Sequence, residues 1–211
     1  MSERKAPAPY QGQRNPRLVT LRRGGSLDDE THQMLALWAA DCAHHVCTYF
    51  TADRPADDRP MRAIEAARQW ARGAVTMAAA REAAYAAHAA ARDTTGAASD
   101  AARAAGHAAA TAHMADHELG PAFYALQAVA KAHPGDSAAV EHERQWQIQQ
   151  LQPGIVDLVH DDMRLRAEKF RGVFDGAAPF NDPSSPWGDR QVTRRVGRRP
   201  ATREPQRQRT Y

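Results

Sequence analysis

Alanine dominates the middle of this chain and limits what the chain can fold into. Between positions 74 and 132, 27 of the 59 residues are alanine, which has the highest helix propensity of all residues but a side chain too small to fill a wide core. Helices faced with alanine can approach to about 8 Å, the short end of the usual interaxial range. This region therefore predicts helices that pack tightly and leave little room for a ligand cavity.

Larger apolar residues recur at helical spacing before the alanine-rich region. Neighbouring positions of the first stripe are three or four residues apart: Leu35, Trp38, Cys42, Val46 and Phe50. We expect a first helix from Ser26, which opens a sequence similar to a capping box, to about Tyr49. The sequence contains neither the alternating pattern of a strand nor a fixed-period repeat. We therefore predict an all-α fold, a single bundle of six or seven helices.

Prolines, glycines and capping residues place the other helix ends. We expect helices over about 60–73, 76–93, from 99 onward, 137–151 and 155–174. Asp58 is placed to cap the helix that begins at Pro60, and Gly73 to end it. The pair Gly120-Pro121 either kinks the helix that begins near 99 or starts a further helix. Both alternatives fit the sequence.

Both ends of the chain are basic and lack apolar periodicity. Residues 1–25 carry six Arg or Lys against one acid, and residues 183–211 carry eight arginines against two acids. Such segments bury too little apolar surface to offset the entropy of ordering, so we expect two disordered basic tails around one folded domain at 26–182. That domain would hold 14 basic and 22 acidic residues, a net charge of −8, although the whole chain carries +3.

The sequence also bears on the compartment of the protein. It contains no run of about 18 apolar residues to span a membrane and no apolar signal-peptide core at its start, so we expect a cytoplasmic protein. Cys42 and Cys47 are five apart in the first expected helix, where they point about 140° apart. That geometry prevents a disulfide, and we expect two reduced thiols that fill the core.

A histidine-rich stretch, AAGHAAATAHMADHELGPA at 104–122, is the strongest candidate for chemistry. If the stretch is one helix, His113 and His117 stack on one face and Asp116 lies beside them. His107 then points in another direction, about 80° from His117 on the helical wheel. This spacing permits a metal site or a catalytic site, but it also suits polar groups that hold one helix to its neighbours.

The metal interpretation needs more ligands than this stretch supplies. Two histidines four apart, His113 and His117, can share one ion, with Asp116 beside them and a further ligand from His88 or Glu82. A zinc site requires at least three protein ligands, and usually four when it is structural. We favour a structural role, in which imidazoles add bulk and hydrogen bonds between closely packed helices. We therefore expect no metal and no cofactor.

The sequence lacks the patterns that mark common enzyme active sites. It contains no GxSxG nucleophile elbow, no HExxH pair and no glycine-rich phosphate-binding loop. Asp41 and His45 are four apart in the first expected helix, where we expect an ordinary intrahelical surface pair. These observations predict that the protein is not an enzyme.

Two other short stretches are conspicuous, DDRP at 57–60 and WARG at 70–73. The simpler interpretation is local, because Asp58 can cap a helix, the arginines can pair with nearby acids and Trp70 can pack. The alternative is an exposed anchor for a partner protein, since Trp and Arg are common at the energetic centres of interfaces.

Five segments in this order resemble the immunity-5-like putative immunity proteins, which are small helical bacterial proteins: WAADCAHHV (38–46), DDRPMRAIEAARQWARG (57–73), AAHAAARD (86–93), AAGHAAATAHMADHELGPAFYALQAV (104–129) and ERQWQIQQL (143–151). The resemblance covers about residues 35–158 and omits both tails. Twelve residues fill motif positions to which the family gives no role: Asp57, Asp58, Arg59, Pro60, Trp70, Arg72, Gly73, His88, His107, His113, Asp116 and His117.

The resemblance implies a protein that binds and neutralises a cognate toxin by protein–protein contact. An acidic folded domain would suit a basic toxin such as a nuclease, because complementary charge speeds association. Two alternatives come from the residues themselves. One is a metal-binding helical bundle that uses His113, His117 and Asp116. The other is a nucleic-acid-associated protein that acts through its basic tails, although an acidic domain would repel the same polymer.

Overall fold

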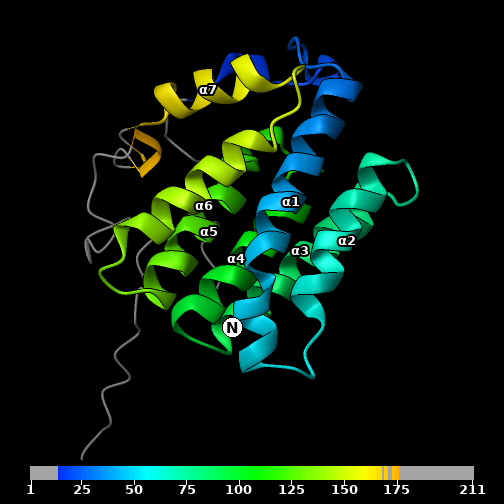
Figure 1. Cartoon of the computed structure of the whole chain (residues 1–211). Coiled ribbons are helices and arrows are strands. Elements are labelled where there is room, and N and C mark those ends of the chain that lie inside the picture. The colour runs from blue at the N-terminus through cyan, green and yellow to red at the C-terminus, as the bar shows by residue number, and fades with distance from the viewer. Residues whose placement is uncertain (1–13, 168, 171–172, 176–211) are drawn as a thin grey trace, which may run out of the picture. The chain divides into compact units, whose positions relative to one another are not determined.

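The computed structural model describes residues 14–167, 169–170 and 173–175, and these residues form a bundle of α-helices (Figure 1). Within them lie seven α-helices: α1 Asp29–Asp53, α2 Arg59–Ala71, α3 Met77–Arg92, α4 Gly96–Ala110, α5 Leu119–Ala132, α6 Ser137–Gln149 and α7 Val156–Leu165. The same residues contain four short 3-10 helices: η1 Pro16–Leu18 and η2 Leu21–Arg23 before α1, η3 Ala115–His117 between α4 and α5, and η4 Val173–Asp175 after α7. Between residues 14 and 175 the described backbone contains no strand, so the all-α prediction is confirmed.

The alanine-rich helix α4 occupies the centre of the bundle. It packs against α1, α2, α3 and α5, while α6 packs against α5. Eleven of its fifteen residues are buried, including Ser99 and Asp100 near its start. Alanine allows this burial on several sides at once, because its methyl group leaves room for close neighbours. Larger side chains such as Trp38 and Phe50, both on α1, complete the core.

Capping residues set the helix starts, with two differences from the sequence-based expectation. The carboxylate of Asp28, and not Ser26, caps α1 by accepting a hydrogen bond from the Thr31 amide. Asp58 lies at the N-cap of α2 but makes no capping hydrogen bond there. Its carboxylate instead forms an exposed ion pair with Arg62, one turn into the helix, so the expected side-chain cap is absent at this position.

The chain between α4 and α5 decides the question raised by Gly120-Pro121. Helix α4 ends at Ala110, the turn and η3 follow, and α5 begins at Leu119 with Pro121 in its first turn. A proline is tolerated there because the first amides of a helix have no intrahelical acceptor. The helical wheel drawn for one continuous helix over 104–122 is therefore wrong, and His113 and His117 lie outside α4.

The first described residues are folded, which corrects the expected extent of the N-terminal tail. Leu18 is 2 % exposed, and the guanidinium groups of Arg14 and Arg17 pair with Asp116 and Asp161. Figure 1 shows this segment beside α7. Apolar periodicity missed it because a single buried leucine between short 3-10 turns has no helical period. The remaining parts of the two expected tails, 1–13 and 183–211, lie outside the described residues.

Including this segment changes the charge of the folded part. Residues 14–175 contain 18 basic and 21 acidic residues, a net charge of −3 and not −8. The four added arginines account for most of the difference. The folded part is therefore close to neutral, and its overall charge says little about a partner.

Two further expectations concern the core and the membrane. Cys42 and Cys47 are free thiols and both are buried, as expected, and burial raises the pKa of the Cys47 thiol to about 11. Helix α7 is shorter than the expected 155–174 and ends at Leu165. In the part of the chain that the structure describes, none of the helices has the length and apolar character needed to cross a bilayer.

Candidate functional site

Four histidines from separate parts of the chain lie together next to the centre of the bundle. His88 comes from α3, His107 from α4, His113 from the turn after α4 and His117 from η3. Successive ring centroids are 5.0 Å apart for His88 and His107, 5.3 Å for His107 and His117, and 5.2 Å for His117 and His113. We call these four residues the histidine cluster. Folding thus brings together all the histidines among the motif positions.

Two glycines provide the space for this cluster. A Cβ atom added at Gly106 on α4 would come within 2.6 Å of Cε1 of His88, and one at Gly120 on α5 would come within 2.6 Å of Cγ of His107. Real Cβ atoms do not approach other atoms so closely. Each ring therefore occupies the place of a missing side chain on the next helix. Sequence reasoning overlooked both glycines as part of the site, although Gly106 directly precedes His107.

The imidazoles of the cluster are held in their neutral form. Burial lowers the pKa of His88 to about 4 and that of His117 to about 3, and it also lowers the pKa of His107 and His113. The side chain of Arg103 adds to this effect at His88 and His107. The Nδ1 atoms of His107 and His117 are 3.3 Å apart, a distance that two neutral rings can bridge with one N–H donor.

Asp116 does not complete a ligand set with the histidines. Its carboxylate is turned to Arg14, with a distance of 2.5 Å between Oδ2 and Nε, and Glu82 is exposed on α3. The Nδ1 atom of His113 is buried and makes no hydrogen bond to any described group. Within the described ranges, no three His, Cys, Asp or Glu side chains are arranged to hold a metal ion. The geometry therefore gives no support to the metal-binding alternative.

A buried arginine lies directly beside the cluster and was missed by sequence reasoning. Arg166, just after α7, contacts the carboxylates of Glu118 and Asp162, with 2.7 Å between its Nη2 and Oε1 of Glu118. It also donates to the backbone oxygen of Asp116. Both carboxylates are fully buried, and burial raises the pKa of Glu118 well above its usual range. These contacts fix α7 to η3, which carries His117.

The DDRP motif forms a clamp at the other end of the bundle. Two guanidinium nitrogens of Arg59 donate to Asp57, at 2.6 to 3.1 Å, and Nη2 also reaches Asp93 at the end of α3 over 2.7 Å. Pro60 is buried in the first turn of α2. The motif therefore ties the start of α2 to the end of α3, which agrees with the local interpretation of Arg59.

The WARG motif also makes local contacts. The Trp70 ring is half-buried and meets the ring of His32 edge-on, with 4.7 Å between centroids. Arg72 pairs with Glu65 on the same helix, and Gly73 follows α2 with a φ of 73°, which glycine adopts at little cost. His32, which sequence reasoning did not single out, contacts the backbone oxygen of Thr111 through Nε2 at 2.7 Å.

The expected surface pair of Asp41 and His45 is wrong. Asp41 pairs with Arg68 on α2, whereas Nδ1 of His45 lies 2.6 Å from Oε2 of Glu143 on α6. The imidazole also stacks on Trp146, with 3.7 Å between centroids and 10° between planes. Tertiary partners replace the intrahelical pair because helix α6, distant in the sequence, packs nearby and supplies a buried carboxylate.

The nucleic-acid alternative depends on basic residues near the chain ends. In the described part of the N-terminal region, Arg14, Arg17 and Arg22 form ion pairs with Asp116, Asp161 and Asp29. Arginines engaged in this way contribute less to binding a phosphate backbone. The other arginines of the two ends lie outside the described residues.

Comparison with known proteins gives one match. A family model described as Imm-5 like putative immunity protein matches residues 25–153. The searches of curated proteins and of solved structures give no match. The matched range contains α1 to α6 and all twelve motif residues, whereas α7 and residues 14–24 lie outside it.

Proposed function

The chain belongs to the Imm-5 like family of putative immunity proteins, and on that premise we propose that it binds a cognate toxin protein and neutralises it. The observation that carries this proposal is the family match over residues 25–153, which spans the whole α1–α6 bundle. We further propose that neutralisation takes place in the cytoplasm and requires no catalysis by this chain.

The surroundings of the motif residues support a binding role over a catalytic one. The histidine cluster is packed into spaces left by two glycines, and Arg59 is occupied by Asp57 and Asp93. Such contacts hold helices in fixed positions, which a protein that recognises another by its surface needs. A general base, in contrast, needs a ring nitrogen within reach of a substrate proton and a pKa near the working pH.

The small net charge bears on how a toxin would be recognised. With −3 over residues 14–175, long-range attraction of a basic toxin is weaker than a domain of −8 would give. Recognition would then depend on particular side chains at the interface, which supply most of the affinity in many complexes.

Titration of toxin activity tests whether this chain neutralises the toxin and whether it does so without catalysis. The full chain would be co-expressed with the toxin encoded beside its gene, and the purified proteins would be mixed at increasing ratios. We expect restored growth, a stable complex in size-exclusion chromatography and complete inhibition at a fixed stoichiometric ratio. Inhibition by far less than one chain per toxin would indicate catalytic inactivation, and an unprotected cell would refute neutralisation.

A further inference from the structure

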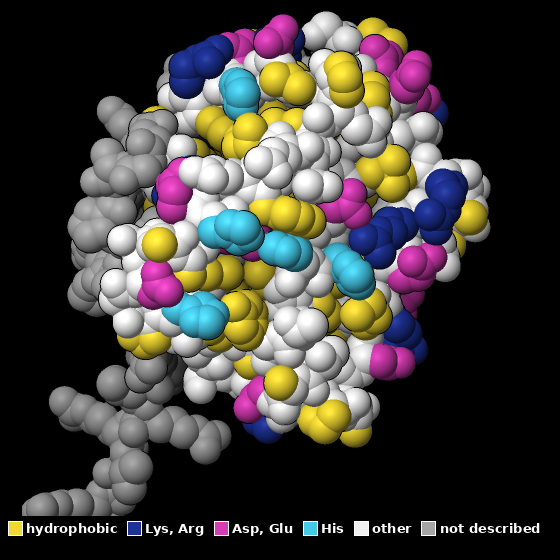
Figure 2. Space-filling view, viewed as in Figure 1, with side chains coloured by type: hydrophobic (Ala, Val, Ile, Leu, Met, Phe, Trp, Pro, Cys, Tyr) yellow, Lys and Arg dark blue, Asp and Glu magenta, His cyan; other side chains and the backbone are white. Residues whose placement is uncertain are grey.

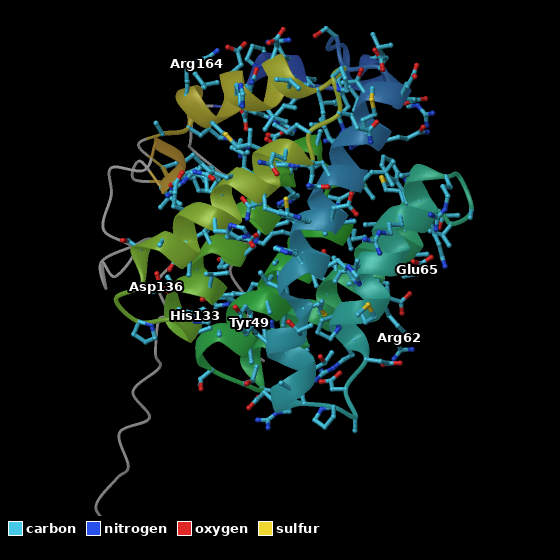
Figure 3. The ribbon with its side chains drawn as sticks, in the orientation of Figure 1. Tyr49, Arg62, Glu65, His133, Asp136 and Arg164 are labelled. Atoms are coloured by element: carbon cyan, nitrogen blue, oxygen red, sulfur yellow. The ribbon has the colours of Figure 1, made fainter. Side chains whose placement is uncertain are left out.

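Exposed histidines gather on the face formed by α1, α6 and the C-terminal end of α5. Figure 2 shows them on the side of the bundle where α1 and α6 face the viewer. We call this surface the histidine face and define it by six residues, of which the four histidines are exposed: His44, His45, Tyr49, His133, His142 and Trp146. At one end of the face, the Tyr49 hydroxyl is hydrogen bonded to Nε2 of His133 at 3.2 Å, and Figure 3 shows the two side chains together.

One imidazole of this face is fixed by a chain of buried contacts. Nδ1 of His45 lies 2.6 Å from Oε2 of Glu143, whose side chain is 3 % exposed. The other carboxylate oxygen accepts a hydrogen bond from Gln147 at 2.7 Å. The side-chain amide of Gln147 also donates to the backbone oxygen of Ala122, and the backbone oxygen of Gln147 accepts a hydrogen bond from the Trp38 indole. The position of a surface histidine is therefore set from the core.

Stacking restricts the same ring from the side. The imidazole of His45 lies nearly parallel to the half-buried indole of Trp146. Yet 37 % of the His45 side chain remains exposed. A surface residue that only filled space would not need such positioning, whereas a side chain ordered before binding lowers the entropy cost of association. Tryptophan is also among the residues most enriched at the energetic centres of interfaces.

The contact with Glu143 determines what the exposed ring nitrogen can bind. A carboxylate accepts hydrogen bonds, so the Nδ1 atom of His45 donates to Glu143, and Nε2 presents a lone pair whenever the ring carries only this proton. Glu143 also adds negative charge below this surface. Burial is the main cause that raises the pKa of Tyr49, and the charge of Glu143 raises it further. A lone pair, a carboxylate charge and an aromatic face together suit a cationic N–H donor.

We propose that the toxin docks on the histidine face, with an arginine or lysine side chain that donates to Nε2 of His45 and packs against Trp146. This inference rests on the proposed function and names the surface and the chemistry of its partner. The twelve motif residues do not overlap with this face. The histidine cluster and Arg59 make contacts between helices of the bundle, whereas His45 is a fixed side chain that remains exposed.

Substitutions that place a positive or a negative charge at exposed His44 test the surface without disturbing the core. His44→Lys should weaken toxin binding about 3-fold to 10-fold, because it repels a basic group at the edge of the contact, and His44→Glu should leave binding unchanged or strengthen it. His45→Phe keeps the stacking but removes both ring nitrogens, including the Nδ1 contact with the buried Glu143, and it should weaken binding about 30-fold, as expected at a hot spot. Tyr85 is an exposed residue of α3, and Tyr85→Lys and Tyr85→Glu are matched controls that should change binding less than about 2-fold.

Calorimetric Kd values for the purified toxin, with circular dichroism melts of each variant, separate the outcomes. The proposal is supported if His45→Phe and His44→Lys weaken binding, the Tyr85 controls do not, and the variants melt like the wild type. If His45→Phe melts at a lower temperature, the difference in affinity between His44→Lys and His44→Glu supports the proposal instead. If the wild type binds the toxin, and His45→Phe and His44→Lys bind it with the same affinity, the histidine face is refuted and the proposed function stands. Weaker binding of His44→Glu than of His44→Lys refutes a basic partner group. Loss of wild-type binding in EDTA refutes direct contact in favour of a bridging metal. No binding or protection by the wild type refutes both proposals.

Discussion

The ring of His88 on α3 lies so close to Gly106 on α4 that a Cβ atom at position 106 would come within 2.6 to 2.8 Å of three ring atoms. Glycine inside a helix costs about 1 kcal/mol relative to alanine. This helix is otherwise rich in alanine, so Gly106 is explained by the ring and not by the helix. The contact joins α3 and α4 at the edge of the histidine cluster.

Gly106→Ala should therefore destabilise the protein, in spite of the better helix propensity of alanine. Overpacking against His88 is expected to cost about 1 to 3 kcal/mol of unfolding free energy. In a His88→Ala background the same change should be neutral or should stabilise by up to about 1 kcal/mol, because the obstructing ring is gone. Urea unfolding of the four chains gives the coupling between the sites. An equal effect of Gly106→Ala in both backgrounds would contradict the packing explanation.

The neutral histidines predict that acid weakens the fold. A histidine in an unfolded chain has a pKa near 6.5, whereas burial lowers that of His88 to about 4. The unfolded chain therefore binds more protons between these values, and the stabilising contribution is complete above about pH 6.5 and is lost as the pH falls toward 4. For His88 alone, we expect a loss on the order of 2 kcal/mol between pH 7.5 and pH 5.

Comparison with His88→Gln isolates this contribution. Both chains share the other titrating groups, including Glu118, whose raised pKa acts in the opposite direction. The unfolding free energy of His88→Gln, measured in urea at both pH values, should fall by about 2 kcal/mol less than that of the wild type. Parallel pH profiles for the two chains would show that His88 is protonated as easily in the folded state as in the unfolded state.

Local signals in the sequence predicted the helices better than the site. Apolar spacing and capping residues placed α1 to α6 with most ends within a few residues, since both act within one or two turns. Pro121 correctly marked a break or a kink, but the choice between them depends on how the turn before α5 packs. The wheel built on one continuous helix consequently misplaced His113 and His117.

The partners of charged side chains could not be predicted, because they come from segments distant in the sequence. His45 contacts Glu143, 98 positions away, and Arg14 contacts Asp116, 102 positions away. A carboxylate four residues along a helix is a reasonable guess for a surface histidine, but it loses to a buried acid on a neighbouring helix. The sequence showed which residues were unusual, and only packing showed which of them remain exposed.

Arg166 should be far more important for stability than a nearby exposed arginine. Arg166→Met would leave the carboxylates of Glu118 and Asp162 buried without their cation, and breaking a buried pair in this way costs about 3 to 5 kcal/mol. Arg164→Met is the matched control: Arg164 (labelled in Figure 3) is exposed and pairs with Asp161, so its loss should cost less than about 1 kcal/mol. Thermal and urea unfolding of both variants would measure the difference, and similar losses would contradict the buried charge contacts.

Removing residues 1–25 should destabilise the protein, contrary to what a disordered tail would predict. The truncation exposes the surface that Leu18 covers and removes the ion pairs of Arg14 and Arg17 with Asp116 and Asp161. Full burial of a leucine contributes about 1.5 to 3 kcal/mol, so we expect a melting temperature several degrees below that of the full chain.

Removal of residues 1–13 alone is the control and should change the melting temperature little, because the contacts described for residues 14–25 are kept. Leu18→Ala in the full chain should reproduce about half or more of the loss. An unchanged melting temperature after removal of residues 1–25 would show that this segment adds no stability to the bundle.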